Sequence, residues 1–113
     1  MQPSEAELIY DWNCAEGDMT PARGRIALND ETLRDGLQSP SVKTPSIEQK
    51  LEILHGLAGI GIDSLNIGLP GAGAHVVADV TRLAQEIVDH KLAIAANCAA
   101  RTLEADIRPI VDI

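Results

Sequence analysis

One stretch decides the fold class: residues 44–70, TPSIEQKLEILHGLAGIGIDSLNIGLP. Thr44 is a typical helix N-cap, and Pro45 suits the first position of a helix. Apolar side chains then recur at helical spacing, at Ile47, Leu51, Leu54 and Ala58. Gly61 is typical of the residue just beyond a helix C-terminus, and a short strand over 62–67 follows it. The stretch therefore predicts a helix that leads directly into a strand.

The same alternation continues on both sides of this stretch. A short strand is predicted over 25–29, and a second helix carries one apolar stripe between Val76 and Val88. A third strand is predicted over 92–96, continuously apolar as expected when both faces of a parallel sheet are covered. Thr102 is expected to cap a third helix, which Pro109 should kink. The side chains expected to face inward from this helix are Leu103, Ile107, Ile110 and Val111.

Alternating strands and helices predict an α/β fold with parallel strands and right-handed crossovers. Three parallel strands alone leave two unpaired edges, and a (βα)8 barrel takes ~250 residues. We therefore interpret residues 25–113 as the first three βα units of a TIM (βα)8 barrel catalytic domain, truncated after them. Residues 1–24 are rich in acidic residues, and we expect them to form a lead-in arm that packs through Leu8, Ile9 and Trp12.

The composition excludes several classes of protein. With 45% apolar residues among 113 the chain is not expected to be disordered, and with 2% aromatic residues its core must be aliphatic. A net charge of −8 argues against binding to nucleic acid, which depends on Lys and Arg. No apolar run is long enough to cross a membrane, and the N-terminus does not resemble a signal peptide. Cys14 and Cys98 lack metal-ligand spacing, so we expect reduced thiols in a cytoplasmic protein.

The stretch most informative about chemistry is residues 29–38, NDETLRDGLQ. It follows the first predicted strand, and a barrel places its catalytic residues at the C-terminal ends of its strands. Arg34 and Asp35 are adjacent, and Gly36 permits a tight turn that aims both at one site. A carboxylate suits a hard divalent cation, and a guanidinium suits a substrate carboxylate or a developing enolate oxygen. The alternative is an exposed Arg-Asp pair that serves only the turn.

The string from Asp30 to Gln38 closely resembles the opening motif of the metal-dependent Claisen-condensation barrel family. That family includes 2-isopropylmalate, homocitrate and citramalate synthases and hydroxymethylglutaryl-CoA lyase. Residues 44–53, 65–70 and 100–107 carry weaker resemblances, so the likeness covers residues 25–113. It implies an acyltransferase that uses a divalent metal ion (Mg²⁺, Mn²⁺ or Zn²⁺) to condense acetyl-CoA or another acyl-CoA with an α-keto acid. It also implies a homo-oligomer at full length, and we expect this fragment alone to be inactive.

The resemblance assigns roles residue by residue. Asp35 would be a metal ligand, and Arg34 would be the catalytic group that stabilises the enolate or the carbonyl under attack. Gln38 would orient the metal-bound keto acid. Arg101 would meet a substrate carboxylate, or else is a surface arginine at a helix start. Two further motif residues, Asp30 and Thr32, either touch ligand or only shape the turn.

The chain departs from the family at two points. Asn66 stands where the synthases carry Glu, and we expect it to point into the barrel as a substrate-binding amide, leaving the surroundings of Arg34 more positive. The alternative for Asn66 is that it satisfies backbone groups at the strand end. The family's later His-x-His ligands are not in this chain, and we interpret its three histidines, His55, His75 and His90, as surface or packing residues.

Three other functions remain open. Leu37 before Gln38 is closer to the lyase than to the synthases, although Thr32-Leu33 and Gly68-Leu69-Pro70 favour a synthase. A non-catalytic protein that reuses part of the barrel is a second alternative. The turn Gly71-Ala72-Gly73 is similar to a dinucleotide-binding turn, but Val76 occupies its third glycine position and no acidic residue follows the third strand, which disfavours that function.

Overall fold

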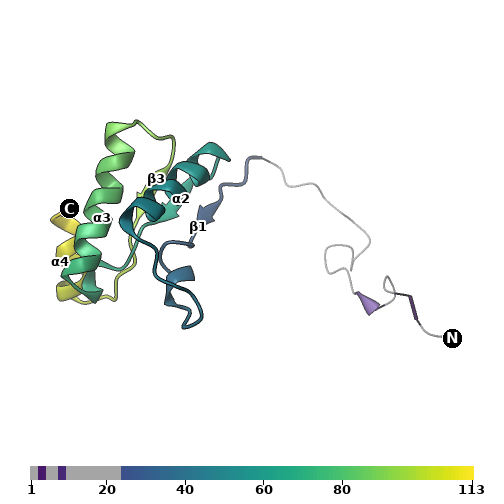
Figure 1. The fold of residues 1–113 in the computed structure, drawn as a ribbon, viewed down its shortest axis with the longest axis horizontal. Coiled ribbons are helices and arrows are strands. Elements are labelled where there is room, and N and C mark those ends of the chain that lie inside the picture. Colours follow the sequence, from purple (N-terminus) through teal and green to yellow (C-terminus); the bar gives the residue numbers. More distant parts are fainter. Residues whose placement is uncertain (1–2, 5–7, 10–23) are drawn as a thin grey trace.

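The computed structural model describes residues 3–4, 8–9 and 24–113 (Figure 1). A parallel sheet has the order β1-β2-β3, formed by β1 (Asn29–Asp30), β2 (Ser64–Asn66) and β3 (Ala95–Asn97). The helices are α2 (Ile47–Gly59), α3 (Ala74–Asp89) and α4 (Glu104–Val111), with 3-10 turns η2 (Gly36–Gln38) and η3 (Pro70–Ala72). The predicted alternation of strands and helices is confirmed, although each strand is shorter than predicted.

The register sorts the strand side chains into two faces. Ser64 aligns with Asn29 and with Ala95, and Asn66 aligns with Asn97. Because side chains alternate along a strand, Asn29, Ser64, Asn66 and Asn97 share one face, whereas Asp30 aligns with Leu65 on the other. Leu65 lies on the other face and is fully buried. The sheet therefore presents a polar face and an apolar face.

The core lies between the apolar face and the helices α2 and α3, which pack side by side (Figure 1). Its buried members are aliphatic, as the composition predicted: Leu33, Leu54, Leu65, Ile67, Val80, Leu83 and Ile94. The prediction that the third strand is covered on both faces is wrong. All three residues of β3 are exposed, because β3 is an edge strand; the residues beside it that reach the core are Ile94, which is buried, and Leu92 and Cys98, which are partly buried.

The two ends of α2 show what local sequence determines. Ser46, and not Thr44, is the N-cap: its backbone N–H donates to Gln49 Oε1 at 2.9 Å, and its Oγ accepts from the Gln49 N–H at 3.3 Å. This reciprocal capping box satisfies two backbone donors, which explains why the helix begins after Pro45. At the other end Gly61 has φ +86°, and its N–H donates to Ala58 O at 3.2 Å, which confirms the predicted helix end.

The orientation of α4 differs from the prediction. Leu103, Ile107 and Val111 were expected to face inward, yet they are 51%, 44% and 70% exposed. Asp106 is the buried residue of this helix, and it packs against the turn η3, where a Cβ on Gly71 would lie 2.9 Å from the Asp106 Cγ. The side of α4 that carries Asp106 therefore faces η3, and the apolar stripe faces outward. The N-cap position belongs to Leu103 and not to Thr102.

The remaining expectations concern the arm, the surface and membranes. Leu8 and Ile9 are exposed, so the prediction that the arm packs through them is wrong, and Trp12 lies outside the described residues.

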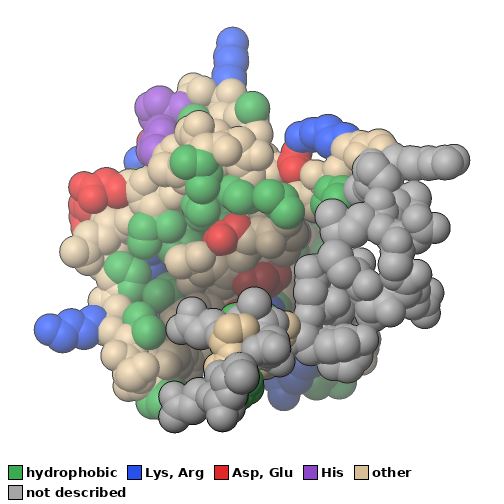
Figure 2. Space-filling view, turned by 90° about the vertical axis from the view of Figure 1, so that its right-hand side faces the viewer, with side chains coloured by type: hydrophobic (Ala, Val, Ile, Leu, Met, Phe, Trp, Pro, Cys, Tyr) green, Lys and Arg blue, Asp and Glu red, His purple; other side chains and the backbone are tan. Residues whose placement is uncertain are grey.

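Hydrophobic side chains are exposed between polar ones on the face shown in Figure 2. Among the described residues, no helix combines the length and apolar character needed to cross a membrane. Cys98 is a free, half-buried thiol, and burial raises its pKa.

Candidate functional site

A network of polar side chains crosses the sheet on its polar face. The Asn29 Oδ1 accepts from Ser64 Oγ at 2.7 Å and from Asn97 Nδ2 at 2.8 Å. Its Nδ2 donates to Glu31 Oε1 at 2.9 Å, and Asn66 Nδ2 approaches the same oxygen at 3.4 Å. The strand register makes these contacts possible, because it aligns the four strand residues on one face. The network therefore converges on the Glu31 carboxylate.

Glu31 in turn holds Arg34. The Arg34 Nε and Nη2 both donate to Glu31 Oε2, at 2.9 and 2.6 Å, and Nη1 donates to Asp35 Oδ1 at 3.1 Å. The Arg34 side chain is 25% exposed, against 67% for Asp35. Charge-assisted hydrogen bonds to a partly buried arginine fix its plane. Arg34 is thus a preorganised guanidinium beside the C-terminal end of β1.

The backbone of residues 30–36 explains this placement. The Arg34 and Gly36 N–H groups both donate to Glu31 O, at 3.2 and 3.1 Å, which closes a tight turn. The Asp30 carboxylate accepts from the Thr32 N–H at 2.8 Å and from its Oγ1 at 3.1 Å, a local hydrogen-bond pattern that stabilises turns. In the structure, therefore, these two motif residues bond to each other within the turn.

Glu31 is the site residue that sequence reasoning missed. Because Asn66 replaces a glutamate on the second strand, we expected the surroundings of Arg34 to be more positive than in relatives that carry this glutamate. The structure shows that Glu31, in the loop after β1, supplies a carboxylate to Arg34. The signal was present in the sequence: Glu31 lies three residues before Arg34, a spacing that brings two side chains together in a helical turn.

Asn66 points onto the polar face, as predicted, and it is 5% exposed. Its Nδ2 faces Glu31, and its Oδ1 accepts from the Gly68 N–H at 3.3 Å. Asn66 therefore joins the network around Arg34 and also satisfies a backbone donor at the strand end. The two interpretations of this residue are compatible.

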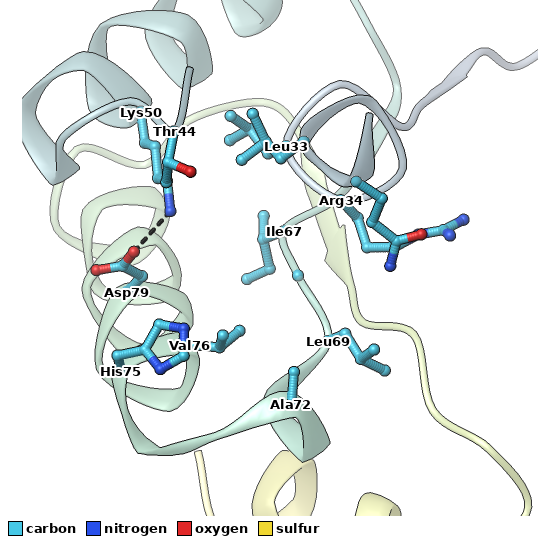
Figure 3. Close-up of a pocket in the computed structure, with 13 residues that line it drawn as sticks. Leu33, Arg34, Thr44, Lys50, Ile67, Leu69, Ala72, His75, Val76 and Asp79 are labelled. Atoms are coloured by element: carbon cyan, nitrogen blue, oxygen red, sulfur yellow. Dashed lines mark hydrogen bonds and ion pairs between the residues drawn. The ribbon is translucent and has the colours of Figure 1, made fainter. Parts of the chain in front are cut away.

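A cavity of about 230 Å³ opens between the loop that follows β1 and the N-terminal turns of α2 and α3 (Figure 3). Apolar side chains dominate its walls, among them Leu33, Ile67 and Val76, and an ion pair joins Lys50 Nζ to Asp79 Oδ2 at 2.6 Å. In Figure 3 the Arg34 side chain extends away from that ion pair. The cavity thus borders the Arg34 turn from the helix side.

The other predicted site residues lie in three places: in the cavity, on or beside the polar face of the sheet, and near α4. Gln38 lines the cavity together with Arg34, whereas Asp35 and Asn66 do not line it. Arg101 is apart from both: its Nε and Nη2 donate to the Asp106 carboxylate at 2.7 and 3.0 Å, and its backbone N–H donates there at 3.1 Å. These bonds lower the pKa of Asp106, against the effect of burial, and raise the pKa of Arg101.

Asp35 offers one ligand atom to a metal ion. Its exposed carboxylate is a hard oxygen donor of the kind that Mg²⁺ and Mn²⁺ prefer. Among the described residues, however, no two further imidazole or carboxylate groups lie close enough to Asp35 to form a set of three metal ligands with it. The group of three that does converge lies elsewhere, at His55, Glu86 and His90. Within the described part of the chain, Asp35 is therefore not part of a group of three convergent ligand atoms.

Comparisons with known proteins identify the family of this chain. Residues 25–109 match the family model described as HMGL-like, so the chain belongs to the HMGL-like family, whose domain is a TIM barrel. The chain is 38% identical over 89 residues to 2-isopropylmalate synthase of Prochlorococcus marinus (strain MIT 9313), covering 79% of this chain and 16% of that protein. It is 34% identical over 88 residues to the probable 2-isopropylmalate synthase of Methanopyrus kandleri, covering 78% of this chain and 17% of that protein.

A third relative, 2-isopropylmalate synthase of Parasynechococcus marenigrum (strain WH8102), is 44% identical over 64 residues, covering 57% of this chain and 12% of that protein. The chain thus spans less than a fifth of the length of these relatives. No solved structure matches the chain significantly. The family resemblance of the motif is confirmed, and so is the α/β class of the fold.

Proposed function

We propose that this chain supplies the opening part of the active site of an acyltransferase that condenses acetyl-CoA, or another acyl-CoA, with an α-keto acid. The observation that carries the proposal is the Glu31–Arg34 pair, held at the C-terminal ends of parallel strands by a network of amides. We propose further that the complete enzyme is a cytoplasmic homo-oligomer and that residues 1–113 alone do not turn over.

Arg34 is proposed as the catalytic group. A guanidinium held in place before reaction stabilises negative charge on an enolate or attacked carbonyl oxygen without reorganisation. Glu31 acts as a positioning residue, because it fixes the guanidinium through Nε and Nη2 and leaves Nη1 facing Asp35. Loss of one such donor costs on the order of 100-fold in turnover in other enzymes.

Asp35 is proposed as one ligand of a divalent metal ion. When bound, the ion would polarise the carbonyl of the keto acid. Gln38 and Asn66 are proposed to hydrogen-bond the acid from either side of the Arg34 turn. Arg101 is retained as a candidate for a substrate carboxylate, with the condition that it must first leave Asp106, to which it is bound through three donors.

A carbon–carbon lyase is the second candidate. The residue before Gln38 is Leu37, which favours the lyase branch of the family, and it lines the same cavity as Arg34. Because cleavage and condensation pass through the same enolate, Arg34 would have the same role in either direction. Substrate assays distinguish the two functions.

The proposal is tested in a chimera. Residues 25–109 of this chain replace the matching segment of the Prochlorococcus marinus synthase, and release of the CoA thiol is followed with acetyl-CoA and each of three keto acids: 3-methyl-2-oxobutanoate, pyruvate and 2-oxoglutarate. We expect thiol release with one of them and none from the 113-residue chain alone. Cleavage of hydroxymethylglutaryl-CoA would establish the lyase instead. A chimera with the circular dichroism and oligomeric state of the parent but neither activity would contradict the proposal.

Asp35→Asn in this chimera tests the ligand assignment. It removes the charge that a hard cation prefers, so Mg²⁺ or Mn²⁺ affinity should fall together with turnover. Arg34→Lys is the matched control, because it leaves the carboxylate in place and should leave metal affinity nearly intact. An unchanged metal titration in the asparagine variant would remove Asp35 from the ligand set.

A further inference from the structure

A group of three side chains of the types that ligate metals lies at the opposite end of the fold from Arg34. His55 is in the last two turns of α2, while Glu86 and His90 are at the C-terminal end of α3. Helices in βα units run antiparallel to the strands, so their C-terminal ends lie near the N-terminal ends of the strands. Glu31 and Arg34 lie at the opposite side, near the C-terminal ends of the strands. The two sites are therefore separate.

The three side chains converge on one carboxylate oxygen. The His55 Nε2 lies 2.7 Å from Glu86 Oε1, and the His90 Nδ1 lies 3.2 Å from the same oxygen. All three ligand atoms lie within 4.8 Å of one another, and the imidazole rings meet edge to face with centroids 5.5 Å apart. Figure 2 shows histidine side chains close together at the upper edge of the molecule. Two helices thus direct two imidazoles and one carboxylate to a common point.

We propose that His55, Glu86 and His90 form a binding site for Zn²⁺ that joins the C-terminal ends of α2 and α3. Two imidazole nitrogens and one carboxylate oxygen are a common zinc ligand set, completed by a water molecule. With bonds of about 2.1 Å, tetrahedral ligand atoms lie about 3.4 Å apart. The His90–Glu86 distance of 3.2 Å is close to this value. The ion therefore requires the His55 nitrogen to move away from Glu86 by about 0.7 Å and the two imidazoles to adjust around it.

Burial and charge around the site favour a cation. The Glu86 side chain is 8% exposed, whereas those of His55 and His90 are 43% and 55% exposed, so an ion can enter from solvent to a fixed carboxylate. The Glu86 carboxylate is held between His55 and Arg82, at 2.7 Å from each. The partial negative charge at the C-terminal end of each helix adds to the attraction.

Arg82 completes the arrangement without blocking it. Its Nη2 donates to Glu86 Oε2 at 2.7 Å, the oxygen that the histidines do not contact. This contact holds the carboxylate so that Oε1 alone faces the imidazoles. Outer partners of this kind orient metal ligands and strengthen binding in known sites. Oε1 is left as the ligand atom.

The test is zinc titration of the 113-residue chain by calorimetry, with Co²⁺ absorption as a second readout of tetrahedral coordination. We expect one ion per chain, and a loss of affinity of at least tenfold in His55→Gln and in His90→Gln. His75→Gln is the matched control, because His75 is the chain's other histidine and lies by the cavity near Arg34. It should bind zinc like the unmodified chain.

Folding is checked in each variant by circular dichroism and by the urea midpoint. Because both imidazoles are about half exposed, we expect the spectrum and the urea midpoint of each variant to stay close to those of the unmodified chain. Zinc should raise the urea midpoint only where both His55 and His90 are present. Absence of saturable binding would overturn the proposal. So would affinity unchanged in both histidine variants, or one ion shared by two chains.

Discussion

Lys91 adopts a left-handed backbone conformation that lowers the free energy of unfolding, and its replacement by glycine should raise that free energy. The helices α2 and α3 end in the same hydrogen-bond pattern: Ile62 and Leu92 donate to Leu57 O and Ile87 O at 3.1 and 3.0 Å, five residues back. Both patterns need a left-handed residue after the helix. In α2 it is Gly61, with φ +86°, and in α3 it is Lys91, with φ +49°.

The size of the effect follows from this comparison. A side chain in the left-handed region costs about 1–2 kcal/mol, because its Cβ crowds the following carbonyl oxygen. Glycine loses about 0.5–1 kcal/mol more chain entropy on folding, so the net gain for Lys91→Gly should be about 0.5–1 kcal/mol. With a urea dependence of about 1–2 kcal/mol per molar, the unfolding midpoint should rise by about 0.5 M.

The assay is urea unfolding followed by circular dichroism at the helix band. Lys91→Ala is the matched control, because it removes the same charge from the helix end but keeps the Cβ. The glycine variant should exceed the alanine variant by about 1 kcal/mol. Gly61→Ala should lose about 1 kcal/mol, since a Cβ there meets no other atom and the cost is conformational only. Equal stability of the glycine and alanine variants at position 91 would refute the reasoning.

Three other changes test the packing and the site. Gly68→Ala should lower the free energy of unfolding by about 2–3 kcal/mol, because the residue has φ +149° and a Cβ would lie 2.7 Å from Val80 Cγ2; an unchanged urea midpoint would contradict this contact. Asp106 has a lowered pKa because of Arg101, so its contribution to stability is complete above pH 3.8 and is lost as the pH falls through the lowered value. Asp106→Asn should remove that part of the acid dependence measured by urea unfolding, and an unaltered acid profile would show that the ion pair does not act. Asn66→Glu should change turnover of the chimera by at least about tenfold, equal to ~1.4 kcal/mol, by adding a second carboxylate to the network; a change within twofold would place Asn66 outside the site.

Much of the fold could be predicted because the signals were local. The apolar spacing after Pro45 predicted the helix α2, and the glycine at position 61 predicted its C-terminal end. The start of the helix was misplaced because Thr44 and Ser46 are equally good caps by type, and only the partner Gln49 selects between them. Such reciprocal contacts are visible in sequence when the third helical position is examined together with the cap.

The orientation of α4 could not be predicted in the same way. Its apolar residues have helical spacing, but spacing alone does not show which face a helix buries. The packing of Asp106 against the turn η3, together with its ion pair to Arg101, overrides the apolar stripe. That contact depends on two loops meeting in space, which periodicity does not encode.

The candidate site was predicted in part for a related reason. The motif identified Arg34 and Asp35, and strand alternation placed Asn66 on the correct face of the sheet. Glu31 was missed because the motif was interpreted through its other residues, whereas the chain supplies the charge partner of Arg34 from the same turn. Charge pairs within a turn require the turn geometry, and this geometry depends on Asp30.

The measurement that tests the central claim most directly is the turnover of the chimera with Arg34→Lys and with Glu31→Gln, at saturating acetyl-CoA and keto acid. If Glu31 holds Arg34 for charge stabilisation, kcat should fall on the order of 100-fold in the lysine variant and by a smaller factor in the glutamine variant, with folding and metal affinity intact. A kcat within twofold of the unmodified chimera in both variants would contradict the account, because the guanidinium would then have no part in the reaction.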